Sequence, residues 1–274
     1  MRKISNILFL LLTLFCTALM TACGDPDITE PTTVLSLSDL PGKSIGVLKD
    51  SQADLAASVL EDPASDQAPA VVVRYKKLDD AVKDLKKAKL DCVILDSFSA
   101  AQYYMENGKL AVLEDAFSWQ EYSICLNNSS SWLQEEINRV LALMDEDGTL
   151  QRIHEKYADG MPSEEESMEM EVYEGEQVLR VLTGSDRYPY VYTTSEGQLA
   201  GIEVDIAREI CHRLDYELIL EEMDMENIFR EVAAGEAEMG IAALSPEMDP
   251  TGECIFTDSY SFASQQVLIR NIRK

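Results

Sequence analysis

The stretch LDDAVKDLKKAKLDCVILD, residues 78–96, places a helix pattern directly before a strand pattern. The apolar residues of its first part recur at helical spacing: Leu78, Ala81, Val82 and Leu85. Its second part, 90–96, is an almost continuous apolar run, typical of a buried strand. The stretch MENIFREVAAGEAEMGIAAL, residues 225–244, repeats this plan of helix, break, acid and buried strand. Two copies of one plan predict an α/β protein with two similar lobes.

Strand and helix patterns alternate along the rest of the chain. In the first part we expect strands at 43–48, 70–75, 109–115 and 121–126, and helices from Ser51, over 99–108 and twice within 131–157. In the last part we expect strands at 178–183, 216–223, 239–244 and 265–271, helices over 204–215 and 226–236, and a hairpin-like turn around Gly197. An acidic and poorly patterned linker, 161–177, separates the two parts. The alternation predicts helices on the faces of a sheet, with a ligand cleft between the lobes.

The first 22 residues have the features of a bacterial lipoprotein signal. A positive start, an apolar run over 7–14 and small residues precede Cys23. The apolar run is shorter than the roughly 20 residues that a membrane helix needs. We expect cleavage before Cys23, a lipid on its thiol and a flexible tether over 23–34. A plain secretory signal and an uncleaved anchor are the alternatives.

The composition is strongly acidic, with 50 Asp and Glu against 23 Lys and Arg and a net charge of −27. Such a surface repels phosphates and anionic lipid, so we expect no nucleic-acid partner and anchoring through the lipid alone. No C-x-x-C pair occurs, and the histidines, His154 and His212, are isolated on helical segments. We expect no metal and no cofactor, and we expect free thiols at Cys92 and Cys125, with disulfide pairing left open.

Five longer blocks are specific enough to compare with a known family. They are DLPGKSIGVLKDSQAD (39–54), AKLDCVILDSFSA (88–100), INRVLALMDEDGTLQRIHEKY (137–157), VLRVLTGSDRYPYVYTTSEGQLAGIEVDIAREICHRL (178–214) and FREVAAGEAEMGIAALSPEMDPTGECIFTDSYSFASQQVLI (229–269). These blocks resemble the family 3 extracytoplasmic solute-binding proteins of the polar amino acid type. The resemblance implies a two-lobed, type II periplasmic-binding-protein fold.

The order of the blocks differs from that of the family, because the second-lobe blocks come first. The resemblance therefore implies a circular permutant. The implied divisions are a signal at 1–22, a tether at 23–34, the second lobe at 35–122, return helices that pack on the first lobe at 123–160, the linker at 161–177 and the first lobe at 178–274. Two fragments that each pair with another chain are the alternative.

The resemblance also implies a set of ligand-binding residues: Ser51, Gln52, Asp96, Arg187, Tyr188, Met225, Ala243 and Ser245. Asp96 falls where the family holds a ligand ammonium, and it is equally placed to cap the following helix. Ser51 and Gln52 open a helix, which suits either an anion or a plain cap. Arg187 or Tyr188 takes the place of an aromatic ring over the ligand, and Met225 falls on a cleft wall or in the core.

One departure from the family concerns the ligand carboxylate. Pro250 falls where the family has a carboxylate-binding arginine, and Ala242 and Ala243 fall on its paired serines, so that only Ser245 keeps a hydroxyl. A bidentate carboxylate contact needs a guanidinium, which proline lacks. We therefore expect a small polar solute with an ammonium group, either amino-acid-like or an amine, rather than an ordinary α-amino acid.

The expected function is that of a monomeric, lipid-anchored, extracytoplasmic solute-binding protein that serves an ABC importer and is not an enzyme. A sensory or interaction lipoprotein with a degenerate site is the alternative. A dehydratase-type enzyme is a weaker one, because Arg187 is the one cationic group expected near the cleft.

Overall fold

The computed structural model describes residues 34–106, 108–158, 162, 173, 175, 177–184, 187–250 and 252–271. The expected signal, Cys23, nearly all of the tether and most of the acidic linker lie outside these residues. Contacts divide the chain into Met1–Glu30 and Pro31–Lys274, and the second unit is described below. Within the described residues, no helix is both long and apolar enough to cross a membrane.

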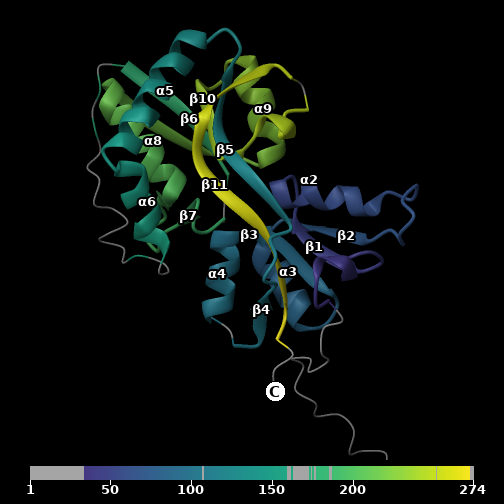
Figure 1. Ribbon diagram of the computed structural model, residues 1–274. Coiled ribbons are helices and arrows are strands. Elements are labelled where there is room, and N and C mark those ends of the chain that lie inside the picture. The colour runs from purple at the N-terminus through teal and green to yellow at the C-terminus, as the bar shows by residue number, and fades with distance from the viewer. Residues whose placement is uncertain are drawn as a thin grey trace, which may run out of the picture. The chain divides into compact units, whose positions relative to one another are not determined.

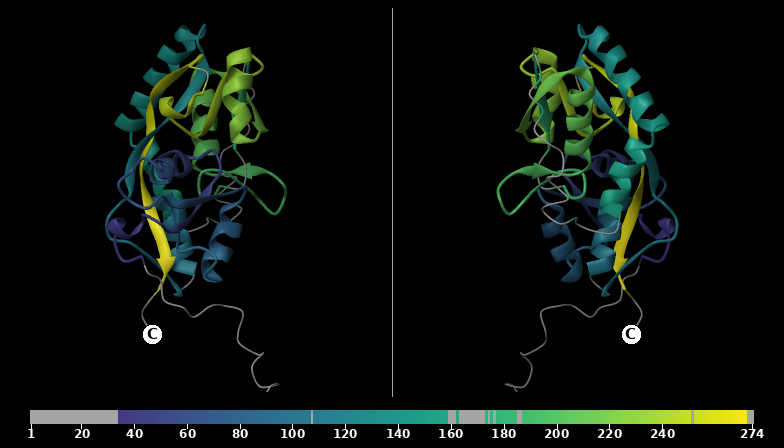
Figure 2. Two further views of the ribbon diagram at one scale, coloured as in Figure 1. Left: turned by 90° about the vertical axis from the view of Figure 1, so that its right-hand side faces the viewer. Right: turned by 90° about the vertical axis from the view of Figure 1, so that its left-hand side faces the viewer.

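Two long strands, β5 (Ser118–Asn127) and β11 (Cys254–Arg270), join two lobes in one sheet. β11 pairs antiparallel with β5 from Cys254 to Gln265, and its last residues pair with β3 and β4. The nine-stranded sheet has the order β2-β1-β3-β11-β5-β10-β6-β9, with β4 on β11. β11, drawn in yellow, runs from one lobe to the other (Figures 1 and 2).

The lobe that contains β1, here the β1 lobe, is a parallel α/β unit. Its elements are η1 (Leu37–Asp39), β1 (Ser44–Leu48), α2 (Gln52–Ser58), η2 (Val59–Glu61), β2 (Val71–Tyr75), α3 (Leu78–Lys86), β3 (Cys92–Asp96), α4 (Ser97–Glu106) and β4 (Leu110–Val112). β1 pairs parallel with β2 and β3. β3 is buried along its whole length because α2 packs on one face of the sheet, and α3 and α4 pack on the other. The predicted apolar face of α3 is confirmed as buried.

The lobe that contains β6, here the β6 lobe, is built in the same way. Its elements are β6 (Gln177–Thr183), β7 (Tyr192–Thr193), β8 (Leu199–Ala200), α8 (Ile202–Leu214), β9 (Tyr216–Glu222), α9 (Met225–Ala234), β10 (Met239–Leu244) and η3 (Pro246–Met248). β6 pairs parallel with β9 and β10, and β7 and β8 form the expected hairpin around Gly197.

Helices α5 (Ser131–Glu146) and α6 (Thr149–Ala158) follow β5 and pack on the β6 lobe. Their buried residues share one cluster with β6 and α8, for example Ile137 with Leu179 and Ile206. α9 covers the opposite face of the same strands, where Ile228 and Val232 pack against Cys125 (Figure 1). The β6 lobe therefore has its sheet between two helical layers.

The length of β11 departs from the prediction, which placed a strand only at 265–271. Residues 257–264 are rich in Ser, Thr and Asp, and so read as a loop. In the fold they pair with β5 through register shifts between Phe256 and Ser261. The Thr257 hydroxyl accepts the Ile124 N–H at 3.0 Å and thereby satisfies a backbone donor that the irregular ladder leaves free. Tertiary pairing with β5 thus overrides the local loop pattern.

The described cysteines are free thiols, as expected for Cys92 and Cys125. Cys92, Cys125 and Cys211 are buried in the core, and Cys254 is half-buried at the start of β11. Burial raises the pKa of Cys92 and of Cys211 to about 12, so that these thiols behave as small apolar groups.

Candidate functional site

The carboxyl ends of the parallel strands in both lobes face one buried cavity. β1 and β3 approach it from the β1 lobe, and β10 and the segment after β6 approach it from the β6 lobe. Its polar lining residues are Ser51, Gln52, Asp96, Tyr122, Arg187 and Gln265. This edge of an open α/β sheet is where ligands usually bind. The cavity measures about 20 Å3, which is room for about one water molecule.

Five of the eight sequence-predicted residues line this cavity: Ser51, Gln52, Asp96, Arg187 and Ala243. Ser245 lies beside it and accepts a hydrogen bond from the side-chain amide of Gln52. Met225 contacts Arg187, with 3.8 Å between its Sδ and the Nη1 of Arg187. Tyr188 lines a separate hollow with Lys77 and Tyr192. Arg187 and Tyr188 were the two candidates for the position of the family's aromatic ring, and of these Arg187 lines the cavity.

Asp96 combines the two roles that the sequence left open. Its carboxylate accepts the Ser99 N–H at 3.0 Å and the Ser99 hydroxyl at 2.7 Å, which is a capping arrangement at the start of α4. The same residue is 7% exposed and lines the cavity. Capping thereby orients a buried carboxylate towards the space between the lobes.

Ser51 and Gln52 differ in how far their polar groups are engaged. The Ser51 hydroxyl accepts the Asp54 N–H at 3.3 Å and donates to the Leu48 carbonyl at 2.7 Å, so it is the N-cap of α2. The Gln52 amide nitrogen donates to Ser245, while its Oε1 has no hydrogen-bond partner within the described chain. Gln52 therefore keeps one buried acceptor for a donor in the cavity.

Arg187 and Glu203 form a buried ion pair at the centre of the site. The Nη2 of Arg187 lies 3.3 Å from the Oε1 of Glu203, and the guanidinium lies 4.9 Å from the ring centre of Tyr190. Glu203 is fully buried, and its Oε1 also accepts the Tyr260 hydroxyl at 2.7 Å and the Ala243 N–H. These bonds connect the segment before β7, which carries Arg187, with α8, β10 and β11.

Burial and pairing act on these charges in opposite directions. Burial raises the pKa of the Glu203 carboxyl, and Arg187 only partly offsets this effect. Burial is the largest single effect on the Arg187 guanidinium and lowers its pKa, but Glu203, Tyr122 and Asp96 together outweigh burial, so the pKa is raised overall. Each charge is therefore tolerated in the interior because the other is there.

Backbone strain marks both sides of the cavity. Ala243 has φ +44° at the end of β10, and Asp50 has φ +58° in the turn after β1. Such angles are unfavourable for residues with a Cβ and are found mainly where the surroundings enforce them. The Ala243 N–H bonds to Glu203 and to the Tyr260 hydroxyl, and the Asp50 N–H bonds to Asp54 at 3.0 Å. The strained positions hold the two strand ends in place around the cavity.

The sequence reasoning missed Glu203, Tyr122 and Gln265. Glu203 lies in the first turn of α8, where an acid reads as a favourable helix-dipole charge. The sequence does contain an indication that Glu203 is buried, because it lies on the apolar face of the helix near Ile202 and Ile206. Tyr122 and Gln265 come from β5 and β11, and the Gln265 amide donates to the Tyr122 hydroxyl at 3.0 Å.

The fold is the two-lobed α/β arrangement of the type II periplasmic class, and the cavity lies between its lobes. Residues 179–274 match the family model of the bacterial extracellular solute-binding proteins, family 3. The match covers less than half of the chain, and over this segment it confirms the resemblance found in the sequence.

Three relatives each match less than half of this chain. L-cystine-binding protein TcyJ of Escherichia coli is 31% identical over 126 residues, 46% of this chain and 45% of its own. Arginine-binding extracellular protein ArtP of Bacillus subtilis is 25% identical over 132 residues, 46% of this chain and 49% of its own. Cyclohexadienyl dehydratase of Pseudomonas aeruginosa is 29% identical over 83 residues, 30% and 31% of the two chains. The chain thus spans about half the length, or less, of the curated relatives it matches.

Among solved structures, a probable amino-acid ABC transporter extracellular-binding protein, ytmK of Bacillus subtilis, aligns over 85% of each chain. The identity is 10% and the TM-score is 0.44.

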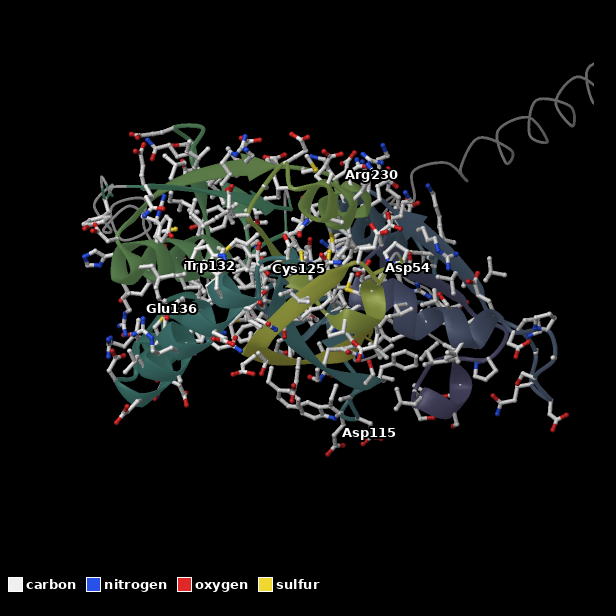
Figure 3. All side chains as sticks on the ribbon, turned by 90° about the horizontal axis from the view of Figure 1, so that it is seen from above. Asp54, Asp115, Cys125, Trp132, Glu136 and Arg230 are labelled. Atoms are coloured by element: carbon white, nitrogen blue, oxygen red, sulfur yellow. The ribbon has the colours of Figure 1, made fainter. Side chains whose placement is uncertain are left out.

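The buried ion pair generates a stability prediction. Replacing Arg187 with alanine leaves the Glu203 carboxylate buried without its cation, and we expect the free energy of unfolding to fall by about 3–5 kcal/mol. The double variant Arg187→Ala/Glu203→Gln should regain much of this loss because it removes the unpaired charge. Urea denaturation measures both. Arg230, on α9, is the matched surface control because its side chain is 66% exposed (Figure 3). A loss no larger than that of Arg230→Ala would contradict the pairing.

Proposed function

We propose that this chain is an extracytoplasmic, lipid-anchored binding protein that captures a small cationic or ammonium-bearing solute between its two lobes. It delivers this solute to the permease of an ABC importer. The main observation in support is that three polar residues from different parts of the fold line one cavity. Asp96 comes from the β1 lobe, Arg187 from the β6 lobe and Gln265 from β11, which joins the lobes. The relatives named for binding cystine and arginine support a solute-binding role.

The charges around the cavity favour a cation. Asp96 and Glu203 contribute two buried carboxylates, and Arg187 contributes one guanidinium. These groups sum to a net charge of −1, so they attract a cation, whereas an added carboxylate meets two like charges. Pro250, where the family has its carboxylate-binding arginine, is exposed and does not line the cavity. The solute class that fits is therefore an amine or an amino-acid-like cation.

Capture requires the lobes to separate, because ligand pockets for small molecules usually measure about 300–1,000 Å3. The contacts that close the cleft include an aromatic one, since Phe98 packs against Tyr190 and His154, and several polar ones. Gln52 bonds to Ser245, Lys49 pairs with Glu226, and the Ser99 hydroxyl donates to the Tyr188 carbonyl at 2.9 Å. Hydrogen bonds and exposed ion pairs of this kind exchange readily with water. We infer that β5 and β11 act as the hinge.

A sensory lipoprotein on the same fold is the second candidate. The observation that favours it is the small cavity, together with the pairing of Arg187 with Glu203. We propose no catalytic role, since the carboxylate that lines the cavity, Asp96, is engaged in capping α4. Incubating the purified protein with the dehydratase substrate of the Pseudomonas relative is the direct check on this point.

The solute prediction compares Asp96 with Ser245. A thermal-shift screen of amines, amino acids and short peptides identifies the best solute, and calorimetry then measures its affinity. Asp96→Ala should cost about 2–5 kcal/mol of binding free energy, because a desolvated charge pair is broken. Ser245→Ala should cost about 0.5–1.5 kcal/mol, the value of one neutral hydrogen bond.

Asp96→Asn is the control that separates charge from capping. Asparagine keeps a cap acceptor but has no charge, so it should preserve stability and still lose most of the affinity. Tight binding of an acidic or neutral amino acid that Asp96→Ala leaves unchanged would show that the site assignment is wrong.

The attachment prediction concerns Cys23. Wild-type protein should appear in the membrane fraction and carry a lipid label, because the leader has the pattern of a lipoprotein signal. Cys23→Ala should lose the label and change the fractionation, with Cys16→Ala as the matched leader control. An unlabelled wild type with identical fractionation of both variants would rule out lipid anchoring at this residue.

We further propose that the chain is a circular permutant of its family, opened between the β11 strand and the β1 lobe. Leu35 and Asn271, near the two described ends of the chain, line the same hollow, so a short link between them is feasible. Each lobe also takes its parallel strands from one continuous part of the chain.

The permutation prediction is that the family order folds as well. A chain that runs 177–271, then a short Gly/Ser linker, then 34–158 should give the same far-UV spectrum, a similar melting temperature and the same solute binding. Light scattering should report a monomer. A reordered chain that folds only as a dimer, or only after the separate halves are mixed, would favour the alternative of two fragments that pair between chains.

A further inference from the structure

Arg187 fills the space in which a solute would be held. Its side chain is about nine-tenths buried and lines the cavity, whose remaining volume is about 20 Å3. It comes from the segment after β6, between Tyr190 behind it and the carboxyl ends of β3 and β10 in front. The closed cleft therefore already contains a guanidinium that belongs to the chain.

The surroundings of this guanidinium are those of a bound cation. Glu203 accepts from its Nη2 at 3.3 Å, the Tyr190 ring lies 4.9 Å from its centre, and the Met225 sulfur lies 3.8 Å from its Nη1. Carboxylates and aromatic faces are the usual partners of guanidinium and ammonium ligands. Its Nε and the second oxygen of Glu203 lack hydrogen-bond partners within the described chain. The hydrogen bonding around the guanidinium is thus incomplete, and a ligand that bonds to these atoms would gain binding free energy.

We propose that Arg187 is a built-in competitor of the solute: its guanidinium occupies the place of the solute's cationic group, and binding requires its displacement. The proposal rests on the proposed function and specifies the solute class as a guanidinium or alkylammonium monocation. Glu203 and Asp96 are then the groups for which Arg187 and the solute compete. The lobes close without solute because the chain supplies the charge itself.

Competition within the chain has a measurable cost in affinity. A solute binds only the fraction of molecules in which Arg187 has left its place, so the apparent affinity falls in proportion to that fraction. Removing the side chain beyond Cβ opens the space and leaves the carboxylates without a cation. A small cation of matching shape should then bind more tightly to the variant than to the wild type.

The test uses Arg187→Ala and ethylguanidinium, which carries the atoms that the substitution removes. Calorimetry and thermal unfolding of the full mature chain should show saturable binding to Arg187→Ala at least about tenfold tighter than to wild type, with a raised melting temperature. Arg230→Ala, which removes an exposed guanidinium from the same lobe, should behave as wild type (Figure 3). Sodium chloride at equal ionic strength controls for salt effects. Arg187→Ala/Glu203→Gln should lose the gain, because the buried carboxylate is gone.

A second variant keeps the test decisive if Arg187→Ala does not fold. Arg187→Gln retains a donor for Glu203 and still shortens the side chain, and it is titrated with the guanidinium ion in the same way. Equal affinity of wild type and both variants for these cations would overturn the proposal. A screened solute that binds wild type and Arg187→Ala equally well would also overturn it, while leaving the solute-binding function intact. Cation binding by the variant together with an empty wild-type screen would support it and count against transport.

Discussion

The antiparallel pairing of β5 with β11 is the constraint on which the rest of the molecule depends. These two strands are the part of the sheet that both lobes share, since β11 bonds to β5 in one lobe and to β3 and β4 in the other. They also carry Tyr122 and Gln265 into the cavity, so the strands that join the lobes also supply residues to the candidate site. The other strands pair within their own lobe or with β5 or β11, so the same sheet can form from a chain with its parts in another order while this pairing is kept. The proposed permutation is therefore physically compatible with this architecture.

The polar chemistry of the cleft follows from where these strands leave the sheet. β3 and β10 both end at the cavity, and each has a constrained residue there: Asp96, the last residue of β3, caps a helix, and Ala243, one residue before the end of β10, has a positive φ. Glu203 reaches the same point from the first turn of α8 and bonds to the Ala243 N–H. A buried carboxylate there needs a cation, and the Arg187 guanidinium meets that need. Shape and charge at the site are thus coupled, since the group that fixes the end of β10 also fixes Arg187.

Much of the fold was predictable because local and tertiary preferences agree. The stripe of α3, the buried run of β3 and the hairpin at Gly197 follow directly from periodicity and turn residues. β11 could not be read correctly at 257–264, because its polar residues are satisfied only by β5, which lies more than 100 residues earlier in the chain. The candidate site divides in the same way. Asp96 and Arg187 could be predicted because they lie in sequence blocks that resemble the family. Glu203 gains its role only when α8 packs against β10 and β11.

The position of the guanidinium explains why an arginine in this cleft does not act as a carboxylate clamp. A clamp must present two free donors to the ligand, as a bidentate fork does. Arg187 directs one terminal nitrogen at Glu203 and the other at Met225, and it stacks on Tyr190. A ligand carboxylate would have to displace Glu203, which has further bonds from Tyr260 and Ala243 and cannot reach water. A cationic ligand, in contrast, would have to displace Arg187, whose guanidinium contacts Glu203 through a 3.3 Å hydrogen bond. Under the proposed function, this asymmetry between an anion with several hydrogen bonds and a more weakly bonded cation favours a cationic solute.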